Sequence, residues 1–224
     1  MVAKIAIFGS ADPNLKEKHI NQAYKLGEII GKAFGNKVEL LTGACIGLPQ
    51  TVSSIAKKGG TRIRGYSGET SLEAHNKNPN YVNPSDLDEL IFLEEKDRQL
   101  NGFTNRSLNM IKDAQALIYL GGRTGTATEY FAAYDEAPQK PMYVLLGAGG
   151  ISDRIKWLGI KKLRIGKIFK TLSAFDLAVE LDNDFNISDF QNDPNNFIVE
   201  PIGPLSWTQF AYDHPGRRKV IFKD

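Results

Sequence analysis

The residues from Leu120 to Tyr130, LGGRTGTATEY, combine a glycine-rich turn with a single carboxylate. Glycine lets the backbone approach another group closely, and the first turn of a helix leaves its amide groups unpaired. A glycine-rich turn that leads into a helix is therefore a place where backbone amides can hold a phosphate. The members of this turn that we predict to contact a phosphate are Gly121, Gly122, Arg123, Thr124, Gly125 and Thr126.

Two structural explanations compete with this prediction. The glycines could simply turn the chain between a strand and a helix. Thr126 and Glu129 could also form a capping box, in which the two residues satisfy each other's backbone amides at a helix start. A second glycine-bearing turn, Gly43 to Gly47, favours the phosphate interpretation, because it also follows an apolar run.

Other phosphate and metal sites lack their motifs. Gly125 is followed by Thr126 and Ala127 rather than by the lysine of a Walker loop. The first apolar run ends in Gly9 and Ser10 without the GxGxxG of a dinucleotide site. We predict no metal site, no cofactor and no internal disulfide, because the histidines are scattered and the cysteine is single: His19, His75, His214 and Cys45.

Strand and helix patterns alternate along most of the chain. Apolar runs typical of buried strands cover 4–8, 38–41, 62–66, 89–93, 116–120, 142–146 and 168–170. Helical patterns cover 13–34, the residues after Pro49 to about 58, 103–112, 126–137, 152–158 and 173–181, the first with Asp12 as its expected cap. This alternation predicts an α/β fold of three layers, in which an open parallel sheet carries helices on both faces.

The predicted sheet brings the glycine-bearing turns together. In open parallel sheets, ligands bind beyond the carboxyl ends of the strands. Gly9, Gly43–Gly47, Gly121–Gly125 and Gly147–Gly150 all follow predicted strand ends. We therefore expect them to share one edge of the sheet.

The alternation of patterns divides the chain. Residues 1–182 are predicted to form one domain, in which 67–86 is a long polar loop. Residues 183–224 contain four prolines and many Asn and Asp, which is typical of an extension without regular structure. We expect this extension to pack on the domain or to cover its site, with 218–222 as an added edge strand.

The charge balance excludes some classes of partner. The chain has 28 basic and 26 acidic residues, so no strong field attracts nucleic acid or a membrane surface, and neither partner is predicted. No apolar run is long enough to span a membrane, and the N-terminus lacks the pattern of a signal peptide. A cytoplasmic location is the expectation.

At this point the motifs resemble a known family. The pattern G-G-x-x-G-T-x-x-E at 121–129, with Arg106 placed 23 positions before Glu129, resembles the LOG family, whose members often carry a lysine decarboxylase label. The segments FGSAD (8–12) and TGACIGLPQTVSSIAKKGG (42–60) resemble its first two turns. The likeness covers about residues 3–182 and implies a Rossmann-like fold. The wider superfamily includes nucleotide sensors and a molybdenum-cofactor carrier.

The resemblance implies a function and a set of site residues. The family includes hydrolases that cleave the N-glycosidic bond of a nucleoside 5′-monophosphate, which implies that ligand, or a related phosphorylated ribose compound, as the partner here. It implies that Arg106 and Glu129 are the catalytic pair at the ribose, and that the phosphate or nucleotide contacts include Gly9, Ser10, Gly43 and Gly47 as well as residues 121–126. It also implies a homodimer. A lysine decarboxylase is not expected, because no lysine resembles one that holds pyridoxal phosphate.

The sequence also allows a different role for Arg106 and a different function for the chain. Arg106 could be an ordinary arginine on a helix surface. The family's hydrolases usually place a lysine after this arginine, where this chain has Ser107, and a glycine is common where it has Arg123. The second functional hypothesis is therefore a non-catalytic carrier or sensor that binds a nucleotide or a phosphorylated cofactor.

Overall fold

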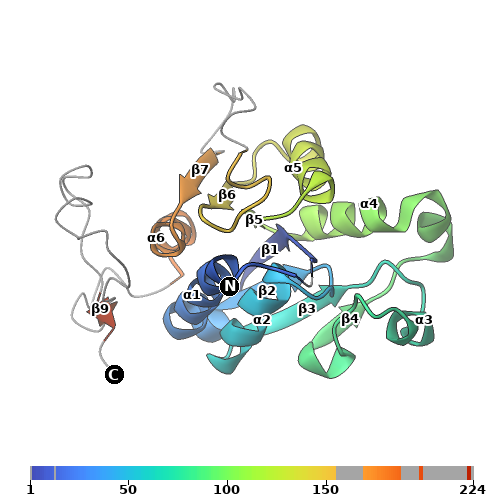
Figure 1. Ribbon diagram of the computed structural model, residues 1–224, viewed down its shortest axis with the longest axis horizontal. Helices are drawn as coiled ribbons and strands as arrows, with labels where there is room; N and C mark the ends of the chain where they lie inside the picture. The colour runs from blue at the N-terminus through green and yellow to red at the C-terminus, as the bar shows by residue number, and fades with distance from the viewer. Residues whose placement is uncertain (1, 13, 155–168, 188–196, 199–220, 223–224) are drawn as a thin grey trace. The chain divides into compact units, whose positions relative to one another are not determined.

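A computed structural model describes residues 2–12, 14–154, 169–187, 197–198 and 221–222 (Figure 1). The contacts between Cα atoms divide the chain into two compact units, Met1–Ile187 and Ser188–Asp224. In the described part of the first unit, strands alternate with helices, and the strands pair only in parallel. The predicted Rossmann-like α/β fold is confirmed.

One seven-stranded sheet forms the middle layer, in the order β4-β3-β2-β1-β5-β6-β7. Its strands are β1 (Ala3–Gly9), β2 (Val38–Thr42), β3 (Arg62–Tyr66), β4 (Glu89–Ile91), β5 (Ala116–Leu120), β6 (Met142–Leu145) and β7 (Phe169–Leu172). The direction in which strands are added reverses between β1 and β5. Such a reversal opens a crevice at the carboxyl edge of the sheet, where ligands of these folds bind.

Helices cover both faces of the sheet (Figure 1). They are α1 (Glu17–Ile29, continued by π-helical Ile30–Phe34 and 3-10 helical Gly35–Lys37), α2 (Leu48–Lys58), α3 (Leu72–Lys77), α4 (Glu95–Asp113), α5 (Thr124–Glu136) and α6 (Ala174–Phe185), with a 3-10 turn at Pro84–Asp86. Helices α1, α2 and α6 pack together, and α4 packs with α5 on the other face. None of the helices in the described ranges is long and apolar enough to cross a membrane.

Alternating residues of the strands fill the two cores. Ala6 and Phe8 of β1 point to the side of α4 and α5, where they share a buried cluster with Met110, Tyr119 and Tyr130. The intervening side chains of β1, among them Ile5 and Ile7, are equally buried. The central strands are thus buried on both faces, which explains their continuous apolar runs.

The structure corrects several predicted boundaries. Asp12 does not cap a helix: its carboxylate accepts from the Asn14 amide at 2.9 Å, and α1 begins only at Glu17. Helix α4 begins eight residues before the predicted 103, at Glu95. The predicted 67–86 loop contains α3, which Ser71 caps by accepting from the Ala74 amide. Most of the helix predicted at 152–158 lies outside the described residues; 151–154 form turns.

The second unit is described at two short strands. β8 (Phe197–Ile198) pairs antiparallel with β9 (Ile221–Phe222). The predicted edge strand at 218–222 is therefore wrong in its pairing, because its described residues join β8 instead of the main sheet. The rest of the predicted extension lies outside the described residues, so its position on the domain or over the site stays a prediction.

Candidate functional site

Three of the predicted turns meet at the carboxyl edge of the sheet. Parallel pairing sets Ile7 beside Thr42 and Gly9 beside Leu120, so β1, β2 and β5 end next to one another. Backbone bonds join the turns that follow: the Ser10 amide donates to the Leu120 carbonyl at 3.2 Å, and the Leu48 amide donates to the Ser10 carbonyl at 2.9 Å. Turns that follow residues 111 positions apart in sequence, Gly9 and Leu120, thus form one surface at the strand-order reversal.

The first turn of α5 lies on this surface without a side-chain cap. Arg123 is its N-cap residue and makes no side-chain capping bond. The amides of Thr124, Gly125 and Thr126 lie in the first turn, where a helix offers them no carbonyl. Arg123, Thr124 and Gly125 are exposed, whereas Thr126 is buried. This turn can therefore accept an anion at its N–H groups.

Two glycines shape this turn in different ways. Gly122 has φ +83°, and a Cβ built on it would lie 2.0 Å from the Thr126 hydroxyl oxygen, so the position requires glycine. Gly125 is helical, and a Cβ built on it would meet no heavy atom within 4 Å. The space above Gly125 is open, which would let a ligand approach the backbone closely.

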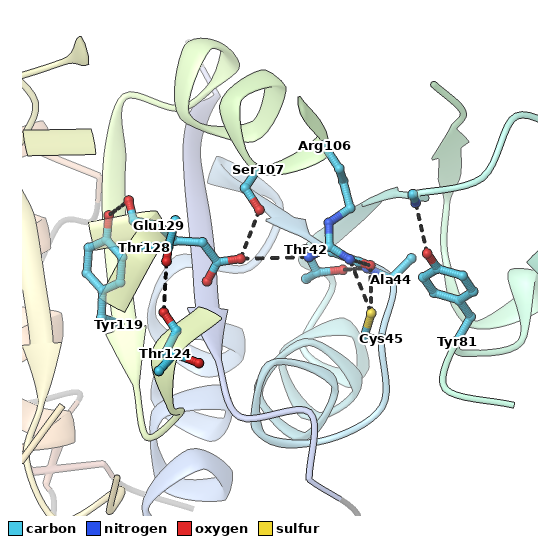
Figure 2. Close-up of polar contacts among 12 residues, drawn as sticks. Thr42, Ala44, Cys45, Tyr81, Arg106, Ser107, Tyr119, Thr124, Thr128 and Glu129 are labelled. Carbon is cyan, nitrogen blue, oxygen red and sulfur yellow. Dashed lines mark hydrogen bonds and ion pairs between the residues drawn. The ribbon is translucent and has the colours of Figure 1, made fainter. Parts of the chain in front are cut away.

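The capping-box interpretation of Glu129 is wrong. Thr126 is the third residue of α5 rather than the residue before it. The Glu129 carboxylate turns away from the helix start toward α4, where its Oε1 accepts a hydrogen bond from the Ser107 hydroxyl at 2.8 Å (Figure 2). The Nη2 atom of Arg106 lies 3.7 Å from the same Oε1.

Arg106 is buried, so the surface-arginine interpretation is wrong as well. Only 7% of the residue is exposed. Its Nη1 donates to the Gly43 carbonyl at 3.2 Å and to the Cys45 sulfur at 3.3 Å, and its guanidinium lies 5.1 Å from the centre of the Phe103 ring. The buried Nε atom has no hydrogen-bond partner in the described structure. A buried donor without an acceptor is costly, and a bound ligand could satisfy it.

Burial and charge oppose each other at Glu129. Burial raises the pKa of the carboxyl, while the Arg106 charge and the Ser107 hydrogen bond act in the opposite direction. The side chain retains 16% of its exposure. A partly buried carboxyl with a raised pKa, paired with a buried arginine at a sheet edge, is typical of a functional site.

The turn after β2 places a thiol beside this pair. Gly43 allows the close approach of Arg106, because a Cβ built on it would lie 2.9 Å from the guanidinium carbon. The segment 80–82 supports the turn: the Val82 amide donates to the Ala44 carbonyl, and the Ile46 amide donates to the Asn80 carbonyl, both at 2.9 Å. Burial raises the pKa of the Cys45 thiol, and Arg106 opposes that shift. Sequence reasoning missed the contact of Cys45 with Arg106 and the hydrogen bond of Ser107 to Glu129.

Some predicted amides are already used within the protein. The Gly121 amide donates to the Ser152 hydroxyl at 2.8 Å. The fourth glycine turn is closed by Asp153, whose two carboxylate oxygens accept from the Gly147 and Gly149 amides at 2.9 and 3.1 Å. The amides of Gly121, Gly147 and Gly149 are therefore occupied within the protein, whereas the first turn of α5 offers unpaired ones.

The structure also has a cavity away from Arg106 and Glu129, and it bears on whether a metal could bind. A cavity of about 550 Å³ lies at α3 and the segment 78–84, lined by His75, Tyr81 and several asparagines, and no predicted site residue lines it. Among the side chains that the structure describes, no group of three or more His, Cys, Asp or Glu residues could hold a metal ion.

A family model, described as the SLOG cluster4 family, matches residues 2–162. The comparison with curated proteins gives no match.

Solved structures with the same fold are similar at low identity. The structural-genomics target TM1055 is 21% identical, with a TM-score of 0.64 over 81% of this chain and 99% of its own. The molybdenum cofactor binding protein from Rippkaea orientalis is 20% identical, with a TM-score of 0.62 over 83% of this chain and 98% of its own. DNA processing protein A from Helicobacter pylori, described as binding single-stranded DNA, is 16% identical, with a TM-score of 0.57 over 81% of each chain. At these identities the likeness extends to the fold alone.

Proposed function

This chain belongs to the SLOG cluster4 family, and from that premise we propose that it binds a nucleoside 5′-monophosphate, or a related phosphorylated ribose compound, and hydrolyses its N-glycosidic bond. One observation carries the proposal. The buried pair of Arg106 and Glu129 lies beside the uncapped first turn of α5, at the strand-order reversal of a parallel sheet. An anion site and a carboxylate are thus adjacent.

The phosphate binds at the first turn of α5 in this proposal. The amides of Thr124, Gly125 and Thr126 face it, with Arg123 exposed beside them. The helix dipole and the unpaired N–H groups both favour an anion there. Gly9, Ser10, Gly43 and Gly47 shape the neighbouring walls, since their turns adjoin the same edge.

The ribose then reaches Glu129. Glu129 follows Thr126 by three positions, about 4.5 Å along the helix axis, a span that a sugar ring can cover. As the bond from C1′ to the base nitrogen breaks, positive charge develops on the sugar, and the carboxylate stabilises it. A water oxygen bonds to C1′, its proton passes to Glu129, and the electron pair leaves with the base nitrogen, which is then protonated. The products are the free base and ribose 5-phosphate.

A non-catalytic binder is the second candidate, and one observation favours it. Ser107 bonds to Glu129 where the family's hydrolases usually have a lysine, so the site retains its anion-binding turn but not that cation. The described molybdenum cofactor binding protein has the same fold. A carrier or sensor would bind the phosphorylated ligand without cleaving it.

Ligand binding and release of free base test the two candidates. Millimolar AMP, GMP, CMP and UMP are compared with the four nucleosides in thermal unfolding, while chromatography follows the free base. A ligand at 100 times its Kd stabilises the fold by about 2.7 kcal/mol, roughly 5–10 °C for a chain of this size. Stabilisation by monophosphates with release of base supports the hydrolase, and stabilisation without release supports the binder.

Two outcomes contradict the assignment of a nucleoside 5′-monophosphate as the ligand. One is an equal shift with nucleosides and with their monophosphates. The other is a shift only with a single-stranded oligonucleotide, which is included because a protein of the same fold is described as binding single-stranded DNA.

A further inference from the structure

Ser107 makes the only hydrogen bond that the Glu129 carboxylate accepts from the residues the structure describes. Arg106 carries the opposite charge, but its Nη2 lies 3.7 Å from Oε1, which is beyond hydrogen-bond distance. Its Nη1 donates to the Gly43 carbonyl and the Cys45 sulfur instead. A buried serine in a helix ordinarily bonds to a carbonyl of the preceding turn. Here the hydroxyl is directed across to α5 (Figure 2).

The two carboxylate oxygens of Glu129 are therefore not equivalent. Oε1 contacts Ser107 and Arg106, both from α4. No donor from the described residues contacts Oε2, and the side chain keeps part of its exposure. The carboxylate is held by one oxygen and presents the other.

We propose that Ser107 is a positioning residue for the site: its hydroxyl fixes Oε1 of Glu129, so that Oε2 is the oxygen that takes the proton from water. This inference rests on the proposed function, because it assigns a reacting atom to the proposed base. Removing the hydroxyl would free the carboxylate to rotate toward Arg106 and would leave Arg106 as its one nearby donor.

The charges around Glu129 predict a titration signature. The titratable groups that face it are Arg106 from α4, Cys45 from the turn after β2 and Tyr119 from β5. Of these, Arg106 opposes the upward shift of the Glu129 pKa that burial causes, and the Ser107 hydrogen bond opposes it too. Loss of that bond should raise the Glu129 pKa further, because a hydrogen bond to the charged form favours that form.

The test compares Ser107→Ala with Ser107→Thr in the full chain, with Thr128→Ala as the matched control. Thr128 precedes Glu129, but its hydroxyl bonds to the Thr124 carbonyl at 3.0 Å and not to the carboxylate. Carbon-13 NMR of the side-chain carboxyl follows the Glu129 titration without ligand. We expect an upward shift of about one pH unit in Ser107→Ala, and a titration like that of the parent in Ser107→Thr and Thr128→Ala.

Turnover gives the second measurement. For Ser107→Ala with the monophosphate that the parent cleaves, we expect kcat to fall about tenfold, KM to stay near that of the parent, and the acid limb of the pH–rate profile to move upward. Ser107→Thr should restore both. If Ser107→Ala titrates like the parent, or Ser107→Thr fails to restore what Ser107→Ala loses, the positioning role is wrong.

Failure of the proposed function gives a different result. If the parent cleaves no monophosphate but Ser107→Ala still shifts the Glu129 titration, hydrolysis is excluded. In that case the Ser107 hydroxyl still positions Oε1 of Glu129, but in a site that binds a ligand without cleaving it.

Discussion

At the level of single residues, the position of Glu129 rules out a purely local role. A carboxylate near a helix N-terminus usually stabilises its own helix. Here the side chain crosses to α4 and contacts Ser107 and Arg106 instead. Burying the Glu129 carboxylate and the Arg106 guanidinium costs free energy. Neither helix needs this buried pair in order to form. Such an arrangement is expected where the carboxylate has a task beyond folding.

Replacing Glu129 with Gln separates folding from chemistry. The amide keeps the shape and removes the charge, so on the catalytic hypothesis release of base should fall by about 10²–10⁴ while nucleotide binding persists. Because the folded pKa of Glu129 is raised, the parent loses stability as pH rises through that pKa, and the variant does not. The melting temperature of Glu129→Gln should therefore equal or exceed that of the parent at pH 8, with a smaller difference at pH 5. Parent-like turnover would contradict the assignment of Glu129 as the base.

At the level of secondary-structure elements, the sequence predicted the strands better than the starts of the helices. Strand β5 matches its predicted bounds because five consecutive apolar residues are buried on both faces. The shared edge of the turns followed from the parallel order alone. The sequence could not show that α4 begins at Glu95, because its first two turns are mainly polar and carry little periodic signal.

The candidate site was predictable only in part, for a similar reason. Arg106 and Glu129 could be paired from their spacing, which matched a known family. The contact between Ser107 and Glu129 depends on how α4 crosses α5, which neither helix encodes by itself. The use of the Gly121 amide by Ser152 depends in the same way on a residue 31 positions later.

Two glycines of the α5 turn should respond to alanine in opposite ways. Gly125→Ala should stabilise the free protein by about 0.5–1 kcal/mol, because the position is helical and a Cβ meets nothing. It should weaken monophosphate binding at least tenfold if the phosphate lies against that backbone. Gly122→Ala should destabilise the fold by about 1–2 kcal/mol through its positive φ, with a clash against Thr126 in addition.

Urea unfolding and isothermal titration measure both effects. If Gly125→Ala binds the monophosphate as tightly as the parent, the phosphate does not lie at the first turn of α5.

At the level of the whole molecule, the helices on both faces of the sheet carry large apolar side chains that are exposed to solvent. Phe103 of α4 is 60% exposed and Phe131 of α5 is 42% exposed, on the two helices that cover the same face. Tyr24 of α1, on the opposite face, is 47% exposed. Ile20 of α1 is also exposed, at 37%. Two exposed aromatic rings on one pair of helices favour the α4 and α5 side as the contact surface for a second copy of the chain.

The homodimer that the family resemblance implies should therefore form through α4 and α5. A symmetric dimer presents the same surface from both copies, so one charge placed in it is repeated across the interface and weakens it twice. Phe131→Glu should shift the protein from dimer to monomer at about 10 µM. Tyr24→Glu is the matched change in α1 and should leave the dimer intact, since α1 covers the other face of the sheet. Size-exclusion chromatography with light scattering gives the mass of each variant.

A monomeric parent would exclude the dimer, and dissociation by Tyr24→Glu alone would move the interface to α1. If Phe131→Glu is monomeric and still binds the monophosphate like the parent, each chain carries a complete binding site.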